Sequence, residues 1–509
     1  MGGKVLETRA MSSVLSARDL VIGVFLIAAL AAVGGCSPTA VREPARSSTV
    51  IGEWGPCPDA DAPPSSAIEC ASMTVPVDYN EPDGATFTLP LARIPSTADT
   101  PQLLVMNPGG PGVSGIADLR SELEYYSTFA DTYTIVSFDP RGVAGSSPAV
   151  SCLDDAQKAA IFDQPSVPIT AAETQRRQEL SAGIGAECDR RFSSVLGDVG
   201  TENVVRDMDA MRAAMGFDTL NYLGYSYGTF IGALYAQSFP GRTGRVVLDS
   251  VMDPALDYRE VRHGQARGMQ SSVRAFAQDC LSRSDCPLPG PVDTAVSAVV
   301  DLIGRLDRQP FTGADGRQLS GSRMLALVES SQYQPVAGWP ALRTALGHAL
   351  AGEWPAVVDA AYSPDLMVNP ANSEYLAVVC TDFATERDPQ APAKLAAQWA
   401  AESPLSGGNR AWSLAPCESW PVPPVRKPAT VSPESGGPFL IMSTTGDPAT
   451  PLEWAQSLHR QISGSSLLIA EGPGHLASSQ NTCADEALIA FLKRGTLPPT
   501  PMFTCPPNP

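Results

Sequence analysis

The chain has 509 residues, with 35 basic and 54 acidic side chains and a formal net charge of −19. Nucleic-acid-binding proteins need a basic surface to neutralise phosphates, so this balance argues against a nucleic-acid partner. The sequence also contains no phosphate-binding loop, no dinucleotide fingerprint and no internal repeat, and its four histidines are scattered. We therefore expect no cofactor and no metal site.

The N-terminal 35 residues have the pattern of an export signal. Three basic residues precede an apolar run over residues 20–33, which is shorter than a membrane-spanning helix requires. The run ends in a Val-Gly-Gly sequence before Cys36, which resembles a bacterial lipobox. We therefore expect residues 1–35 to be removed as a signal peptide and Cys36 to be acylated, which would anchor an exported lipoprotein to the cell membrane. Plain secretion and an uncleaved anchor are the alternatives. Residues 36–50 are polar and predict a flexible tether.

Beyond the tether, the first predicted elements are short apolar strands separated by turns. They cover residues 73–77, 87–92, 103–106 and 133–138. The third strand leads into a loop of glycines and prolines at residues 107–112. Glycine allows the main chain to approach a ligand closely, and proline stiffens the loop. In isolation, an ordinary turn explains such a loop as well as a binding role does.

The most informative motif is Gly-x-Ser-x-Gly at residues 224–228, with Ser226 at its centre. A predicted crossover helix at residues 201–216 and an apolar strand at residues 220–223 precede it, and a helix-compatible segment follows at residues 229–236. This order is typical of a nucleophile elbow, in which a tight turn lifts a serine hydroxyl clear of the backbone. Five residues alone are weak evidence in a chain with 43 glycines. A nucleophilic Ser226 also requires a base and an acid elsewhere.

The C-terminal region supplies an acid and a base in the order that such a serine requires. A predicted strand at residues 438–443 ends in a polar turn that contains Asp447, and a second strand at residues 467–470 runs into a loop that contains His475. Successive parallel strands end at the same edge of a sheet, so both side chains are expected there. We therefore predict Asp447 as the acid and His475 as the base.

The other three histidines fit the role of base less well. His263 and His348 precede the acid in the chain, and His459 lies within a predicted helix at residues 452–462. A histidine in mid-helix is most often a solvated side chain.

A serine, a base and an acid together give the glycine-rich loop a function. Attack by Ser226 on a carbonyl carbon builds negative charge on the oxygen, and backbone N–H groups must already point at that position. We assign this oxyanion hole to the N–H groups of Gly110 and Tyr227, the residue after the nucleophile. The predicted reaction is two-step acyl transfer, in which His475 carries the proton and Asp447 orients the imidazole.

Together these motifs resemble the prolyl and tripeptidyl aminopeptidase group of α/β-hydrolases. The likeness is greatest to an actinobacterial lipoprotein branch of secreted serine hydrolases, which are called carboxylesterases or tripeptidyl-aminopeptidase-like proteases. It covers residues 54–505 and is carried by four stretches, at residues 107–115, 138–142, 224–228 and 446–451.

The resemblance implies an α/β-hydrolase fold, with a mostly parallel, doubly wound sheet and a helical cap inserted after the strand that follows the elbow. The hydrolase core would cover residues 51–254 and 436–509, the second part being a TAP-like C-terminal region. The mostly helical cap and a Pro-rich strap would cover residues 255–435. The implied activity is that of a tripeptidyl-aminopeptidase-like protease, and a carboxylesterase or lipase acting on acyl esters of the cell envelope is the alternative. A binding protein on an inactive hydrolase scaffold is a third possibility.

The resemblance also draws attention to two further acids. Asp382 belongs to a Cys-x-Asp sequence that the family often has in its cap, where an acid would pair with the free amino group of a peptide substrate. Hydration on a helix surface explains Asp382 equally well. Asp253 follows the strand that comes after the elbow, and some relatives place the catalytic acid at that strand end, so Asp253 is the rival of Asp447.

Ten cysteines remain when Cys36 is set aside, an even number that suits disulfides in an exported protein. Their spacing suggests five local pairs, which sequence alone cannot establish. The proposed pairs are Cys57–Cys70, Cys152–Cys188, Cys280–Cys286, Cys380–Cys417 and Cys483–Cys505.

Five of the seven tryptophans lie in the predicted cap. A thin helical layer uses large aromatic side chains to build its own core, and such side chains also line apolar substrate pockets. The sequence favours the first interpretation and leaves the second open. The five are Trp339, Trp354, Trp399, Trp412 and Trp420.

Overall fold

The computed structural model describes residues 49–58, 67–363, 366, 372–434 and 436–508. The predicted signal peptide, the acylation site at Cys36 and nearly all of the predicted tether lie outside the described residues. Within the described part of the chain, no helix combines the length and the apolar character that a membrane crossing needs.

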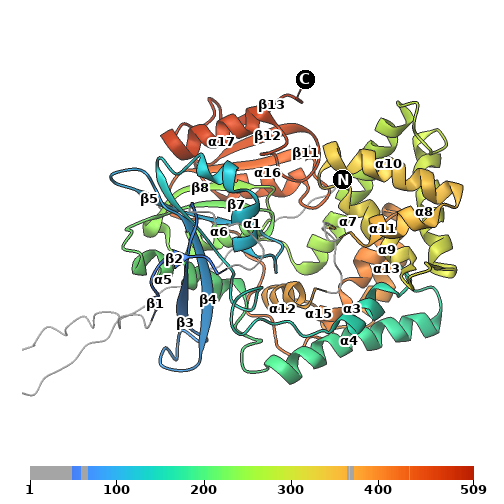
Figure 1. Ribbon diagram of the computed structural model, residues 1–509, viewed down its shortest axis with the longest axis horizontal. Helices are drawn as coiled ribbons and strands as arrows, with labels where there is room; N and C mark the ends of the chain where they lie inside the picture. Colours follow the sequence, from blue (N-terminus) through green and yellow to red (C-terminus); the bar gives the residue numbers. More distant parts are fainter. Residues whose placement is uncertain (1–48, 59–66, 364–365, 367–371, 435, 509) are drawn as a thin grey trace, which may run out of the picture. The chain divides into compact units, whose positions relative to one another are not determined.

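An eleven-stranded sheet forms the centre of the hydrolase core (Figure 1). Its strands follow the order β1-β3-β4-β6-β5-β7-β8-β11-β12-β13, with β2 paired to β3. The pairs among β1, β2, β3, β4 and β6 are antiparallel, and every pair from β6–β5 to β12–β13 in this order is parallel. The strands are β1 Val50–Ile51, β2 Gly55–Pro56, β3 Glu69–Pro76, β4 Thr86–Ile94, β5 Gln102–Asn107, β6 Tyr133–Phe138, β7 Leu220–Tyr225, β8 Thr243–Asp249, β11 Phe439–Gly446, β12 Ser466–Pro473 and β13 Met502–Cys505.

Helices cover both faces of this sheet, which confirms the predicted doubly wound fold. Side chains of α5, α6 and α16 pack on one face with alternate strand residues, and side chains of α1 and α17 pack on the other. This division follows from the strand pleat, because successive side chains point to opposite faces. The core helices are α1 Gly115–Ser121, α2 Leu123–Ser127, α5 Thr201–Ala214, α6 Tyr227–Ser238, η1 Pro240–Arg242, α16 Leu452–Gln461 and α17 Thr482–Arg494.

The cap follows β8 and is mostly helical, as the resemblance implied. Its helices α7 to α11 enclose an apolar cluster of their own, separate from the two clusters against the sheet. The cap elements are α7 Tyr258–Leu281, α8 Val292–Arg308, β9 Phe311–Thr312, β10 Gln318–Leu319, α9 Gly321–Ser330, α10 Pro335–Ala351, α11 Trp354–Ala361, α12 Ser373–Asp382, α13 Ala391–Glu402, α14 Gly407–Trp412 and α15 Ala415–Glu418.

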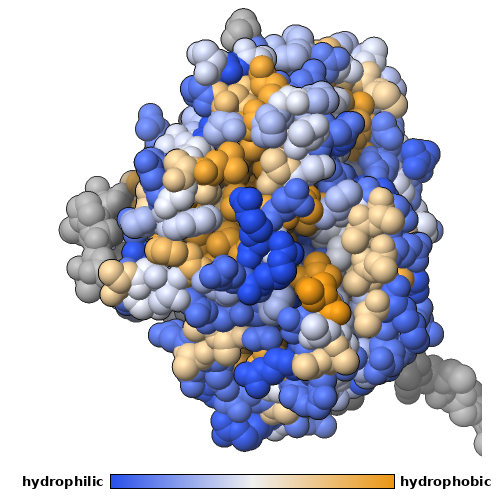
Figure 2. Space-filling view, turned by 90° about the vertical axis from the view of Figure 1, so that its right-hand side faces the viewer, coloured by the Kyte–Doolittle hydropathy of each residue, from blue (hydrophilic) through white to orange (hydrophobic). Residues whose placement is uncertain are grey.

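The cap tryptophans belong to its packed interior. Trp399, Trp412 and Trp420 are at most 2% exposed, and Trp339 is 8% exposed. Trp354 is half-buried and packs against the cap's apolar cluster. Trp339 and Trp354 thus help to build the cap's own core, as the sequence favoured, whereas Trp399, Trp412 and Trp420 belong to a cluster that the cap shares with one face of the sheet. The outer surface on this side of the molecule is largely hydrophilic, with smaller groups of hydrophobic residues (Figure 2).

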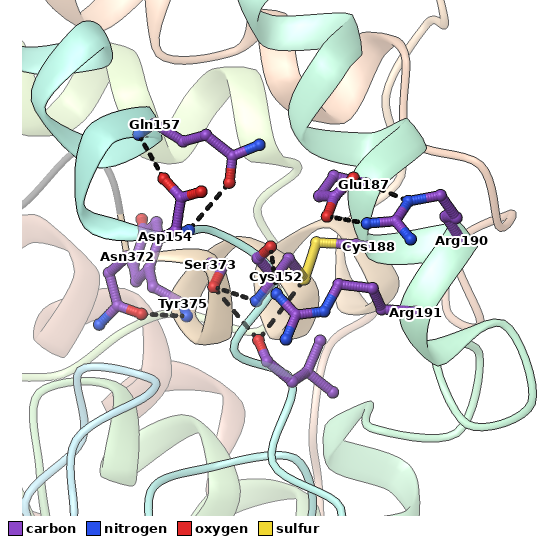
Figure 3. Close-up of a disulfide and its surroundings, with 11 residues drawn as sticks. Cys152, Asp154, Gln157, Glu187, Cys188, Arg190, Arg191, Asn372, Ser373 and Tyr375 are labelled. Atoms are coloured by element: carbon purple, nitrogen blue, oxygen red, sulfur yellow. Dashed lines mark hydrogen bonds and ion pairs between the residues drawn. A yellow bond between two sulfur atoms is a disulfide. The ribbon is translucent and has the colours of Figure 1, made fainter.

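A second segment packs with the cap, although the sequence pattern placed it in the core. Helices α3 (Asp155–Phe162) and α4 (Ala171–Phe192) leave the core after β6, and α4 contacts α12 and α15 (Figure 1). Figure 3 shows how the Cys152–Cys188 disulfide fastens this segment. The N–H of Cys152 donates to Ser373 Oγ of α12 at 3.0 Å, and Arg191 donates to the carbonyl of Cys152 at 2.8 Å.

The disulfides join the five pairs that the spacing suggested. Each closes a loop of 6 to 37 residues. Closing a loop of this size stabilises a fold by about 2–4 kcal/mol, since it restricts the unfolded chain. One pair, Cys380–Cys417, ties α12 to α15 inside the cap.

The motif at residues 138–142 has a structural role. Arg141 is fully buried and forms a two-pronged ion pair with Asp207 of α5, at 2.7 and 2.6 Å. It also donates to the carbonyls of Pro76, the last residue of β3, and of Val77, which follows it. Because a buried guanidinium needs such partners, this stretch holds the crossover helix against the sheet.

Candidate active site

The predicted nucleophile lies in a strained turn between β7 and α6. Ser226 has φ 55° and ψ −123°, a backbone conformation that residues with a side chain rarely adopt. Its N–H donates to the carbonyl of Asp249 in the neighbouring strand at 2.9 Å. Every residue from Leu220 to Ala233 is buried except Ser226, which is half-buried. The turn therefore presents one polar side chain from an otherwise buried segment.

The glycine-rich loop packs directly against this turn. A Cβ on Gly109 would lie 2.4 Å from the carbonyl oxygen of Tyr225 and 2.8 Å from the nitrogen of Tyr227, and one on Gly228 would lie 2.4 Å from the carbonyl oxygen of Asn107. Only glycine fits at contacts this close. The predicted donors Gly110 and Tyr227 thus come from two segments in contact. The N–H of Tyr227 is the first of α6, where no preceding turn of helix supplies an acceptor.

The predicted acid and base are hydrogen-bonded to each other. The Nδ1 atom of His475 lies 2.9 Å from both carboxylate oxygens of Asp447. Because an ionised carboxylate only accepts, Nδ1 carries the hydrogen and Nε2 is left as the acceptor. That Nε2 atom is buried and has no hydrogen-bond partner among the described residues. An acceptor nitrogen of this kind is what a serine base requires.

The surroundings of Asp447 keep its carboxylate ionised. It accepts hydrogen bonds from the N–H groups of Ala449 and Thr450 at 2.8 Å and from the Thr450 hydroxyl at 2.9 Å. Burial acts to raise the pKa of Asp447, but the interaction with His475 and these N–H donors outweigh burial, so that the pKa is lowered.

The loop that carries His475 is held from two sides. Asp249, fully buried at the end of β8, accepts from the N–H groups of Ala477 and Ser478 at 2.8 and 2.9 Å. From the cap, the carbonyl of Tyr333 accepts from the N–H of His475 at 2.8 Å, and the Tyr333 ring lies edge-on at 5.2 Å from the imidazole. Neither Asp249 nor Tyr333 was among the predicted site residues. For Asp249 the available signal was its place at the end of a buried strand next to the elbow.

The alternatives for base and acid have other partners. His263 pairs with Glu402 at 2.8 Å, His348 with Glu353 at 2.6 Å, and His459 with the Ser465 hydroxyl at 2.9 Å. Asp253 accepts from the N–H of Ala255 and from the side chain of Gln461. The structure therefore brings Asp447, and not Asp253, to His475.

The prediction for Asp382 needs correction. The sequence left two interpretations open, a partner for the amino group of a substrate and a hydrated acid on a helix surface, but the side chain is fully buried and fits neither. It accepts from the N–H and hydroxyl of Thr201 at 2.7 Å each, and also from the hydroxyl of Tyr227. A substrate amine would have to break these bonds to reach it. Asp382 instead links the cap helix α12 to the elbow and to the crossover helix α5.

Comparison with known proteins agrees with this geometry. Residues 102–292 match a family model described as alpha/beta hydrolase fold, and residues 403–504 match one described as TAP-like protein. Serine protease Hip1 from Mycobacterium tuberculosis is 35% identical, over 96% of this chain and 98% of that protein. The chain belongs to the TAP-like α/β-hydrolases.

Other relatives in this family carry different activity names. Carboxylesterase B from Mycobacterium tuberculosis is 32% identical, over 98% of this chain and 99% of that protein. Tripeptidyl aminopeptidase from Streptomyces lividans is 30% identical, over 89% and 86%. TAP-like hydrolases that align along nearly their whole length with this chain are thus named as both peptidases and esterases.

The choice between the two acids can be tested directly. Asp447→Asn should lower kcat by about 10⁴-fold, because an amide at this position favours the wrong imidazole tautomer. The matched variant Asp253→Asn should stay within a few-fold of the wild type, since its partners are Ala255 and Gln461. Turnover of a chromogenic ester by both purified variants checks this. A large loss in Asp253→Asn with activity retained in Asp447→Asn would reverse the assignment.

The burial of Asp382 predicts a pH-dependent contribution to stability. Burial raises its pKa from 3.8 to about 6, although its hydroxyl and N–H donors act to lower the pKa. The folded state then binds the proton more tightly than the unfolded state does, so stability falls as pH rises from about 4 to 6. Relative to Asp382→Asn, the wild type should lose on the order of 3 kcal/mol over this range. Urea unfolding of both proteins at pH 4 and pH 7 measures the difference. A constant difference would mean that Asp382 does not titrate there.

Proposed function

We propose that this protein is a serine hydrolase that cleaves peptide bonds in the manner of a tripeptidyl-aminopeptidase-like protease. The observation that carries the proposal is the hydrogen-bonded Asp447–His475 pair, at the same edge of the sheet as the strained turn of Ser226. Membership of the TAP-like hydrolases supports the reaction class. Two of the relatives' names, serine protease and tripeptidyl aminopeptidase, support an amide substrate.

In the proposed reaction, the hydroxyl of Ser226 attacks the substrate carbonyl while Nε2 of His475 takes its proton. Asp447 stabilises the resulting imidazolium, and the N–H groups of Gly110 and Tyr227 donate to the oxyanion. His475 then gives the proton to the leaving amine as the C–N bond breaks, which leaves an acyl ester on Ser226. Water, deprotonated by the same nitrogen, releases the acid product and restores the serine.

Esterase activity on acyl esters of the cell envelope is the second candidate. The same residues perform it, because only the leaving group changes from an amine to an alcohol. The relative named carboxylesterase B favours it, at 32% identity over nearly the whole chain. An amide is harder to cleave than an ester. A peptidase must therefore use binding energy from substrate residues on the acyl side of the scissile bond to stabilise the transition state.

Three matched substrates separate the two activities. They are a tripeptide anilide with a free amino terminus, its acetylated twin and a short-chain nitrophenyl ester. For an aminopeptidase, kcat/KM for the free anilide should exceed that for the acetylated twin by at least about tenfold, because a lost charge contact costs a site 1.4 kcal/mol or more. Ester turnover with no anilide turnover would establish an esterase instead. Ser226→Ala should reduce all activity by at least about 10³-fold, and near-full activity in this variant would refute the nucleophile.

We also propose that the chain is exported and anchored through an acyl group on Cys36, because a short apolar run with small residues precedes this cysteine. Cells that express the full chain with an alkyne fatty acid should label the wild type and leave Cys36→Ala unlabelled. Wild-type protein in the membrane without label would indicate an uncleaved anchor. Unlabelled wild type in the medium would indicate plain secretion.

A further inference from the structure

A buried group of charged and phenolic side chains in the cap reaches both catalytic loops. Arg410 of α14 pairs with Glu329 of α9 at 2.7 Å, and Arg262 of α7 donates to the Tyr375 hydroxyl of α12 at 3.3 Å. The guanidinium carbon of Arg262 also lies 5.8 Å from the centroid of the Tyr258 ring. We call this group the cap cluster. It consists of Tyr258, Arg262, Glu329, Tyr333, Tyr375 and Arg410.

Two members of the cap cluster touch the predicted catalytic loops. The carbonyl and ring of Tyr333 contact His475, at 2.8 Å from its N–H and 5.2 Å from its imidazole. The second member is Tyr375, whose backbone nitrogen would lie 2.7 Å from a Cβ on Gly112. The cap therefore contacts the glycine-rich loop at this point. Both tyrosines are half-buried and therefore keep some exposed surface. The cap cluster thus lies beside the position that a substrate would occupy.

The cap cluster carries one more positive charge than negative. Glu329, 1% exposed, is paired with Arg410, but Arg262 is bonded only to neutral atoms, at 2.6 Å from the Ser413 hydroxyl and 2.8 Å from Gln265 Oε1. Within the described residues, no carboxylate lies in ion-pair distance of Arg262, which is 8% exposed. Glu329 acts on Arg262 only from beyond ion-pair distance and is itself paired with Arg410, so a carboxylate that enters from outside would supply the direct ion pair that Arg262 lacks.

The cap cluster also contains polar atoms that the described protein does not satisfy. They are Glu329 Oε1, Arg410 Nε and the Tyr258 hydroxyl, all buried without a hydrogen-bond partner among the described residues. Buried polar atoms are rarely left unpaired, so the arrangement suits a polar ligand group. An amine is the weaker candidate, because the charge of Glu329 is already neutralised by Arg410 and an ammonium group would face Arg262 as well.

We propose that the cap cluster is a substrate subsite that binds a carboxylate, with Arg262 as its main partner. The preferred substrates are then short peptides with an acidic side chain or a free terminal carboxylate near the scissile bond. This inference rests on the proposed function, because the carboxylate is bound while Ser226 reacts with the neighbouring carbonyl. It adds a specificity that the proposed reaction does not itself require.

The test compares peptides that differ only in charge. Quenched fluorescent peptides carry Glu, Gln or Lys at each of the two positions that flank the scissile bond, and the Gln peptide is also made with a free and an amidated C-terminus. In the wild type, one carboxylate-bearing peptide should exceed its neutral twin in kcat/KM by roughly 10- to 100-fold, as a charge-assisted hydrogen bond provides. The Lys peptide should be the poorest. Equal rates for acid and neutral twins at every position would overturn the proposal without any mutagenesis.

A pair of variants assigns the preference to Arg262. Arg262→Gln should reduce the ratio of kcat/KM for the acid peptide to kcat/KM for its neutral twin to near one. The control is Arg267→Gln on the same helix, whose side chain is 48% exposed and lies 3.8 Å from Glu453. It should leave the ratio unchanged. A ratio that survives in folded Arg262→Gln would show that the carboxylate binds elsewhere.

Labelling of Ser226 separates failure of this inference from failure of the proposed function. A fluorophosphonate probe reacts with an activated serine and needs no cleavable peptide. No labelling of the wild type would refute the serine hydrolase itself. If the acid and neutral peptides slow the labelling to the same extent, the serine hydrolase stands and the carboxylate subsite is refuted. Stronger protection by the acid peptide, lost in Arg262→Gln, is the expected result.

Discussion

A positive φ at Ser226 is the constraint on which the rest of the site depends. A residue with a side chain holds this conformation only where its neighbours leave no alternative. Here β7 enters the turn fully paired between β5 and β8, and α6 leaves it packed against the same strands. The bond from the N–H of Ser226 to Asp249 adds a further tie. The parallel sheet therefore supplies the rigidity that the turn requires.

The same strand end, Asp249, also orders the loop of the predicted base. Its carbonyl accepts from Ser226, and its carboxylate accepts from Ala477 and Ser478, two and three residues beyond His475. One buried residue thus holds the turn of the predicted nucleophile through its backbone carbonyl and the loop of the predicted base through its carboxylate. Burial raises the pKa of Asp249, although its hydrogen-bond donors act to lower the pKa. Burying this carboxylate is therefore unfavourable in itself, and the contacts that it makes with the two loops offset that penalty.

The cap is a structural part of the site. It contacts each of the three segments predicted to be catalytic: Tyr333 contacts the His475 loop, Tyr375 the glycine-rich loop at residues 107–112, and Asp382 contacts Tyr227 of the elbow. The protein as a whole is strongly acidic, with a net charge of −19, whereas the buried cap cluster is cationic. Water and salt screen the exposed acidic charges, but they screen a buried guanidinium only weakly. The guanidinium can therefore determine which substrates bind even though the surface is acidic.

Local patterns in the sequence predicted most of the strands of the hydrolase core, although not β1, β2 or β13. The strand at residues 133–138 and the crossover helix after Thr201 lie where periodicity predicted them, because each has an apolar face of regular spacing. The order of serine, acid and histidine was also readable, since residues after successive parallel strands meet at one sheet edge. The placement of Asp447 beside His475 follows that rule.

The contacts of the cap depended on the tertiary structure. Helices α3 and α4 precede the elbow in sequence, yet α4 packs against α12 and α15 and the carbonyl of Phe162 in α3 accepts from the Ser320 hydroxyl at the start of α9. Asp382 bonds to Tyr227 across 155 residues, and Glu329 pairs with Arg410 across 81. No local spacing encodes such pairs, because they form only when separate helices close over the sheet. The sequence by itself thus determined most of the central strands, the elbow and the order of the candidate catalytic residues, because each depends on a local pattern. Only the folded chain decided which buried charges face the site, because burial and partners are properties of the packed whole.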